Sequence, residues 1–135
     1  TASKDESTRV LSQVKRVIRT TYSNPPTHGA TIVATVLNSA ELRQMWETEL
    51  AEMRERIHGM RKQMVSLLAE YGANRDFSFV GRQVGMFSYS GLTVEQVARL
   101  KNEFGIYALD TGRIAVAALN KSNIHVVTKA IVQVL

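Results

Sequence analysis

The sequence predicts an α/β protein in which one long helix is followed by a small α+β layer. Apolar residues recur at steps of three and four from Leu42 to Leu67, which indicates a long amphipathic helix. Further along, residues 77–80 and 86–90 alternate aromatic or apolar side chains with small polar ones, as half-buried strands do. Of the 135 residues, 44% are hydrophobic and 21% are charged, which is a globular composition and excludes disordered or fibrous classes.

The N-terminal residues predict a helix, a break and a second apolar segment. Ser7 and Thr8 precede apolar residues at helical spacing, so we expect an amphipathic helix that ends near Thr20. Two adjacent prolines, Pro25 and Pro26, follow, and they interrupt a helix because neither has a backbone N–H to donate. A more apolar segment then covers residues 30–37.

The long helix has recognisable ends in the sequence. We expect it to begin at Asn38, with Glu41 three positions later as in a capping box. It is expected to run to Tyr71, with Gly72 as its C-terminal cap. At 1.5 Å per residue it would be roughly 50 Å long, which exceeds the width of a compact domain of this size. The helix is therefore expected either to bridge two bodies or to form a coiled coil.

The residues after Gly72 predict the order β-β-α-β-β-α. Thr93 and Gln96 form a capping-box pattern, and residues 110–112 read as the turn of a hairpin. The expected elements are strands at 77–80 and 86–90, a helix at 93–104, strands at 106–109 and 113–117, and a helix at 122–135. The change of pattern at residues 72–74 is the expected domain junction.

Composition limits the functional classes. Lys and Arg number 17 against 12 Asp and Glu, for a net charge of +5, so anionic ligands are candidates. Nucleic acid is not expected as a partner, because the chain has no Lys/Arg block with interleaved aromatic residues. Without cysteine there is no disulfide or thiolate metal site. No apolar run reaches the roughly 20 residues of a membrane span, and we expect a soluble, cytoplasmic protein.

Two arginines are the strongest candidates for chemistry. His28, His58 and His125 are isolated in the sequence, so neither a metal site nor a catalytic triad is expected. Arg113 opens an apolar strand directly after a tight turn, and Arg19 precedes the double-proline break. A rigidly held arginine presents a planar fork that suits a carboxylate. The alternative is an ordinary surface or salt-bridged arginine.

Several motifs in register resemble a known family. They cover essentially the whole chain and are similar to the C-terminal part of class I aminotransferases, in particular the bacterial aspartate and aromatic amino-acid aminotransferases. The matching segments are Arg19, Tyr22-Ser23-Asn24-Pro25-Pro26, His28-Gly29-Ala30, Ala73-Asn74-Arg75-Asp76-Phe77, Gly85-Met86-Phe87-Ser88-Tyr89-Ser90-Gly91-Leu92, Glu103-Phe104-Gly105, Tyr107, Thr111-Gly112-Arg113 and Val116-Ala117.

The resemblance implies roles for individual residues. Enzymes of this family are homodimers that hold pyridoxal phosphate on a lysine and move an amino group between an amino acid and a 2-oxo acid, commonly 2-oxoglutarate. By resemblance, Arg113 binds the substrate α-carboxylate, and Arg19 reaches into the partner subunit's site to bind a distal carboxylate. Ser23 and Asn24 correspond to loop residues beside that arginine. Phe87 corresponds to the residue that packs over the substrate when the small domain closes.

The resemblance also implies which parts lie outside this chain. It assigns residues 1–37 to the tail of the large cofactor-binding domain, 38–72 to an interdomain helix and 73–135 to the small domain. The anchoring lysine follows Ser-x-Ser in the family, and Lys4 is a false match because its following residues differ. We therefore expect neither catalytic nor cofactor-binding residues here, and no activity of the chain alone. The alternative is a free-standing, non-enzymatic module that binds a carboxylate or a partner.

Overall fold

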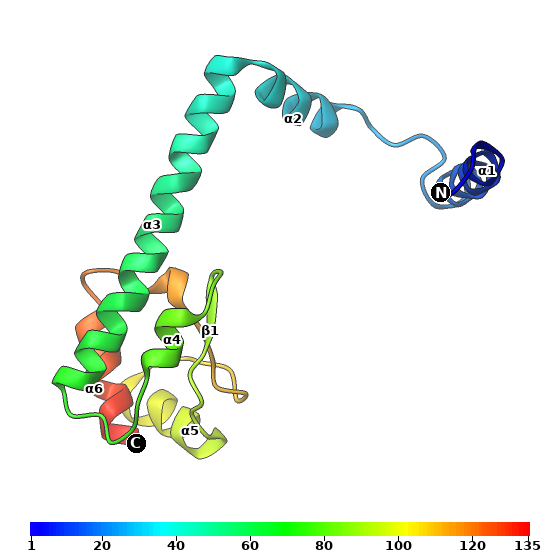
Figure 1. The fold of residues 1–135 in the computed structure, drawn as a ribbon. Helices are drawn as coiled ribbons and strands as arrows, with labels where there is room; N and C mark the ends of the chain where they lie inside the picture. The colour runs from blue at the N-terminus through cyan, green and yellow to red at the C-terminus, as the bar shows by residue number, and fades with distance from the viewer. The chain divides into compact units, whose positions relative to one another are not determined.

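The computed structural model describes all residues, 1–135, as two compact units, Thr1–Glu47 and Thr48–Leu135. Most of the chain is helical, with one two-stranded antiparallel sheet (Figure 1). None of the helices combines the length and apolar character that crossing a bilayer requires. The elements are α1 (Lys4–Thr21), α2 (His28–Asn38), α3 (Ala40–Glu70), α4 (Ser78–Arg82), β1 (Phe87–Tyr89), α5 (Val94–Phe104), β2 (Arg113–Ala115), the 3-10 turn η1 (Val116–Ala118) and α6 (Ile124–Val134).

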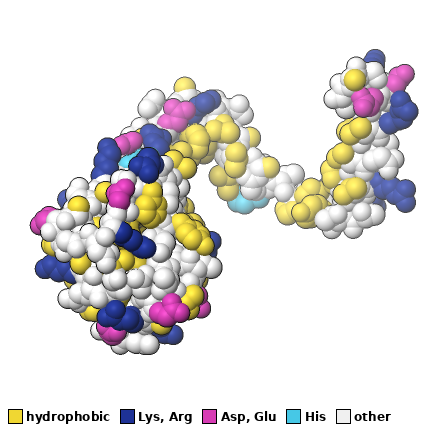
Figure 2. All heavy atoms as spheres, turned by 60° about the horizontal axis from the view of Figure 1, so that its bottom comes forward, with side chains coloured by type: hydrophobic (Ala, Val, Ile, Leu, Met, Phe, Trp, Pro, Cys, Tyr) yellow, Lys and Arg dark blue, Asp and Glu magenta, His cyan; other side chains and the backbone are white.

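The first unit contains α1, α2 and the start of α3, and it has hardly any interior. Helix α1 begins earlier than Ser7 and Thr8 suggested, because the Ser3 hydroxyl accepts the Glu6 N–H at 3.1 Å and caps it. The predicted break at the two prolines is confirmed, since they lie between α1 and α2. No residue of either helix is buried, and their large apolar side chains, such as Leu11, Val17 and Val33, are exposed. Exposed apolar side chains are visible in yellow in Figure 2.

The long helix α3 is confirmed, with a correction at its first residue. Asn38 is the last residue of α2 and does not cap α3. The Ser39 hydroxyl instead accepts the Leu42 N–H, at 3.4 Å. At the other end, Gly72 adopts a φ of 81° and donates its N–H to the Ala69 carbonyl oxygen at 3.1 Å. This left-handed conformation suits glycine and ends the helix as predicted.

The second unit has a hydrophobic core on one face of the C-terminal half of α3. Met64 and Leu68 of this face are fully buried. They belong to one cluster with buried residues of α4, α5, η1 and α6 (Figure 1). Only the C-terminal part of the predicted stripe is buried, at Met60, Met64 and Leu67, whereas its residues from Leu42 to Met53 are exposed. The helical period thus predicts the face of α3 that packs in this core, but not how far along the helix the core extends.

The sheet is smaller than the sequence predicts. Strand β1 pairs antiparallel with β2, with Ser88 opposite Ile114. The predicted strand 86–90 is confirmed in its central residues, and the predicted strand 113–117 in its first three, because residues 116 and 117 belong to η1. Helix α5 is confirmed with its complete capping box, in which Thr93 and Gln96 exchange hydrogen bonds of 2.9 and 3.2 Å.

Two predicted strands are wrong. Residues 77–80 begin the helical turn α4, because the Asp76 carboxylate accepts the backbone N–H and the hydroxyl of Ser78, at 2.8 and 2.6 Å. Such a local side-chain bond starts a helical turn and competes with strand pairing. Residues 106–109 form no strand either. They lead into a tight turn in which Gly112 N–H donates to the Leu109 carbonyl at 2.8 Å.

Candidate functional site

Arg113 is placed by the glycine that precedes it. Gly112 has a φ of +77°, and a Cβ atom at this position would lie 2.8 Å from the Leu92 carbonyl oxygen. The carbonyl oxygen of Gly112 accepts two hydrogen bonds from the buried Ser90, one from its hydroxyl at 2.6 Å and one from its backbone N–H at 2.9 Å. Glycine is therefore required here, and the start of β2 is fastened to the end of β1.

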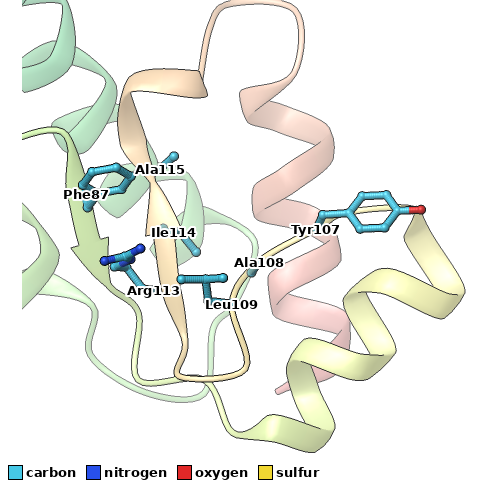
Figure 3. A pocket seen from close by; sticks show the side chains of 7 residues that line it. All are labelled: Phe87, Tyr107, Ala108, Leu109, Arg113, Ile114 and Ala115. Atoms are coloured by element: carbon cyan, nitrogen blue, oxygen red, sulfur yellow. The ribbon is translucent and has the colours of Figure 1, made fainter.

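The register of the sheet brings Arg113 to Phe87. Tyr89 lies opposite Arg113 and Phe87 lies opposite Ala115, so the four side chains project from one face, which is exposed. The Arg113 guanidinium carbon lies 4.9 Å from the centre of the Phe87 ring, within the range of a cation–π contact. Figure 3 shows the two side chains beside each other on neighbouring strands.

An open pocket of about 280 Å³ adjoins this pair. Arg113 is the only charged residue that lines it, whereas the Tyr107 ring points away from Arg113 (Figure 3). The salt bridges of the chain are formed by other arginines, Arg43, Arg54 and Arg99. The Arg113 fork is thus presented to the pocket without a neutralising carboxylate, as a carboxylate-binding arginine must be.

The second candidate arginine is held at the end of α1. Arg19 donates from Nη1 to the Ser23 hydroxyl at 2.6 Å. Ser23 has a φ of 62°, which is uncommon outside glycine, and the next residue, Asn24, donates its N–H to the Tyr22 carbonyl at 2.7 Å. The structure thus brings Arg19 and Ser23 together in the first unit, and Arg113 and Phe87 together in the second. Asn24 adjoins the first pair.

A third arginine was missed at the sequence level. Arg61 of α3 is 1% exposed. Its Nη2 donates to the carbonyl oxygens of Gly85 and Phe87, both at 2.7 Å, and its Nη1 donates to the Val80 carbonyl oxygen at 3.2 Å and to the Ser88 hydroxyl. Burial lowers the pKa of the Arg61 guanidinium from its usual value. The sequence signal that could have identified Arg61 is its position on the apolar stripe, three residues before Met64.

On the edge of β1 that does not face β2, side chains form the hydrogen bonds to the backbone groups. The Gln83 amide accepts the Tyr89 N–H at 2.9 Å and donates to the Tyr89 carbonyl at 3.2 Å, as a neighbouring strand would. Arg75 donates to the carbonyl oxygens of Gly91 and Ser90, at 2.9 and 3.1 Å. Together with Arg61, these side chains protect a strand edge that would otherwise expose unpaired backbone groups.

Comparison with known proteins gives consistent matches along the chain. A family model described as aminotransferase class I and II matches residues 1–131. The chain is 74% identical to the aspartate aminotransferase of Pseudomonas aeruginosa over 135 residues, which are 100% of this chain and 34% of that protein. It is 62% identical over 125 residues to the aspartate aminotransferase of Haemophilus influenzae, covering 93% of this chain and 32% of that protein.

Solved structures give the same result. The aromatic-amino-acid aminotransferase of Burkholderia pseudomallei, whose crystal structure has pyridoxal phosphate covalently bound, matches with a TM-score of 0.96 and 64% identity. The match covers 100% of this chain and 34% of that one. The chain therefore spans about a third of the length of the relatives it matches, and the fold-type I architecture expected from the sequence is confirmed for this part.

Proposed function

The chain belongs to the class I and II aminotransferase family, and from this membership we propose that the whole protein moves an amino group between an amino acid and a 2-oxo acid. Aspartate or an aromatic amino acid is the proposed donor and 2-oxoglutarate the proposed acceptor, and the names of the aspartate and aromatic relatives support the donor classes. The observation that carries the proposal is the Arg113 fork, which faces an open pocket beside Phe87.

In this proposal Arg113 binds the α-carboxylate of the substrate. A guanidinium can donate two parallel hydrogen bonds to a carboxylate, which fixes orientation as well as charge. The Phe87 ring, 4.9 Å from the guanidinium carbon, restricts the arginine to few rotamers and covers the ion pair with an apolar surface. A drier and less mobile ion pair is stronger, because water competes less for both partners.

Arg19 is proposed to bind the distal carboxylate of a dicarboxylic substrate. Its guanidinium is exposed but already held by the Ser23 hydroxyl. The Arg19 side chain therefore loses less conformational entropy when it binds a carboxylate. From the resemblance we propose that this arginine reaches into the partner subunit's site, so a homodimer is part of the proposal. A cytoplasmic location is proposed as well. Ser23 and Asn24 would then shape the loop beside the distal carboxylate.

Pyridoxal phosphate is the proposed cofactor of the whole protein, and we propose that the residues that hold it lie outside this chain. The pocket beside Arg113 is lined by no lysine and by one cation, which suits a carboxylate but not a phosphorylated aldehyde. When bound, this cofactor accepts electrons from the amino acid and carries the amino group. We propose that the lysine and the phosphate contacts come from residues outside 1–135, and that this chain alone is inactive.

The proposed domain assignment follows from the same resemblance. Residues 1–37 are assigned to the large domain, 38–72 to the interdomain helix and 73–135 to the small domain. The lack of buried residues in α1 and α2 supports the first assignment, because apolar helix faces of this kind are normally covered by neighbouring structure. The alternative of a free-standing binding module is not favoured, because the relatives are aminotransferases.

The test is a transamination assay with two proteins and a blank. The whole protein, given pyridoxal phosphate, aspartate and 2-oxoglutarate, is expected to form glutamate and oxaloacetate. The 135-residue chain under the same conditions is expected to match a blank that contains the cofactor alone. A whole protein that forms no glutamate from either aspartate or phenylalanine contradicts the proposed activity, and turnover by the chain alone contradicts the assignment of the missing parts.

A further inference from the structure

Arg61 makes its hydrogen bonds to one short segment. Its guanidinium reaches from α3 to residues 80–88, where it meets three carbonyl oxygens and one hydroxyl. The shortest distances to carbonyl oxygens, both 2.7 Å, are those to Gly85 and Phe87. These are the residue two positions before β1 and the first residue of β1.

These bonds explain why a charged side chain is buried. A guanidinium out of water is costly unless its donors are paired, and four acceptors pair the two terminal nitrogens of Arg61. Its Nε remains without a partner. A lysine could not replace this arrangement fully, because an ammonium is a point donor whereas the guanidinium is a rigid planar fork.

The geometry connects Arg61 to the candidate carboxylate site. Phe87 is held on one side by β2, where it lies opposite Ala115, and on the other side by Arg61 at its carbonyl oxygen. Its ring is the one that lies against the Arg113 guanidinium. A shift of the Phe87 backbone would therefore move the ring that limits the rotamers of Arg113.

We propose that Arg61 is a positioning residue for carboxylate recognition. Arg61 contacts neither Arg113 nor the pocket beside it. It holds the backbone of Gly85 and Phe87, and so keeps the Phe87 ring against Arg113. The expected effect of Arg61 on substrate binding rests on the proposed aminotransferase function. Its expected effect on the stability of β1 does not depend on that function.

The same helix offers a matched control. Arg56 lies five residues earlier on α3 and also donates to two backbone carbonyls, those of Leu119 at 3.0 Å and Ala117 at 2.9 Å. Both acceptors follow β2, and neither belongs to β1. Ala117 donates its own N–H to the Met86 carbonyl oxygen at 3.1 Å, but no bond of Arg56 reaches Phe87. Arg56→Lys thus weakens a pair of arginine–carbonyl bonds on the same helix without removing a bond of Phe87.

The first measurement is amide hydrogen exchange of residues 86–89 in the 135-residue chain. Arg61→Lys is expected to speed exchange roughly tenfold, because local opening of β1 becomes easier, and Arg56→Lys is expected to leave it unchanged. Ser88→Ala, which removes one acceptor of Nη1, is expected to give a smaller increase. This variant keeps the test decisive if Arg61→Lys does not fold. Unchanged exchange in both Arg61→Lys and Ser88→Ala overturns the proposal.

The second measurement is steady-state kinetics of the whole protein. Arg61→Lys is expected to raise KM for aspartate by roughly tenfold with a smaller change in kcat, since a misplaced binding group weakens substrate orientation. Arg61→Met is expected to raise KM further, so that lysine gives partial rescue. An unchanged KM in a folded Arg61→Lys variant overturns the proposed link to substrate. An inactive wild-type protein refutes the proposed function instead, and hydrogen exchange then decides the role of Arg61.

Discussion

The Arg113 guanidinium stacks on the Phe87 ring at 4.9 Å, although the two residues belong to different strands. Their contact is a diagonal one, set by the pairing of Tyr89 with Arg113 and of Phe87 with Ala115. A change in register by one residue would turn one of the two side chains to the other face. The candidate site therefore depends on the bonds that fix this register, above all those at Gly112.

Gly112→Ala is expected to destabilise the chain by about 1–3 kcal/mol, because the new Cβ meets the Leu92 carbonyl and the positive φ becomes strained. Chemical denaturation of the 135-residue chain measures this change. Gly59→Ala is the matched control, since a Cβ there has no neighbour within 4 Å and the residue lies inside α3. It is expected to stabilise by up to about 1 kcal/mol. Equal stability of the two variants would contradict the account.

Leu68→Ala tests the core beneath the site. Leu68 is fully buried in the cluster that joins α3 to the following elements, so the substitution is expected to cost about 2–5 kcal/mol of unfolding free energy. Leu50→Ala, on the same helix but 43% exposed in this chain, is expected to cost less than about 1 kcal/mol. Urea unfolding followed by circular dichroism compares them, and a similar loss in both would mean that the core lies elsewhere.

Asp76 predicts a specific acid sensitivity. Its pKa is lowered by the hydrogen bond from the Ser78 hydroxyl and then by that from the Ser78 N–H. A carboxyl with a lower pKa in the folded state contributes stability above its unfolded pKa, and this contribution is lost as the pH falls through the folded value.

The Asp76→Asn variant is therefore expected to lose less stability than the wild type as the pH falls below roughly 4. Denaturation midpoints between neutral and acid pH provide the measurement. Ser78→Ala, which removes only the hydroxyl donor, is expected to reproduce part of the change. Parallel pH profiles for Asp76→Asn and the wild type would show that the bond does not stabilise the fold.

Arg19→Leu tests the proposed distal carboxylate contact in the whole protein. It is expected to lower kcat/KM for aspartate by on the order of 100-fold, because a charged bidentate partner is lost. Phenylalanine has no distal carboxylate, so its kcat/KM is expected to change little. Arg16→Leu, three residues earlier on α1, is the control and is expected to leave both substrates unaffected. Equal losses for aspartate and phenylalanine would contradict the assigned role.

The fold could be predicted where the signals are local. The apolar stripe of α3, the left-handed Gly72 and the Thr93–Gln96 capping box each depend on a few neighbouring residues. The alternation at 77–80 led to a wrong strand prediction. Alternation indicates which residues face the core, whereas a strand also needs a neighbouring strand to pair with. Asp76 supplied a competing local bond with Ser78, and no partner strand was present to outweigh it.

The site could be predicted only in part. Arg113 and Arg19 followed from their positions beside turns and from the family motifs, but Arg61 required knowledge of what the buried face of α3 meets. The partners of Arg61 lie 19 to 27 residues away in sequence, and no spacing rule relates them. Gln83 bonds to Tyr89, only six residues away, and completes the edge of β1. It was missed because residues 77–80, just before it, were predicted to be a strand and not the start of α4.

Arg113→Lys in the whole protein tests the central claim most directly. Every amino-acid substrate carries an α-carboxylate, so the account predicts that kcat/KM falls by roughly 100-fold or more for aspartate and phenylalanine alike, because lysine keeps the charge but loses the fork. Thermal unfolding of the same variant serves as the control for folding. An unchanged kcat/KM for either substrate in the folded variant would show that Arg113 does not bind the α-carboxylate.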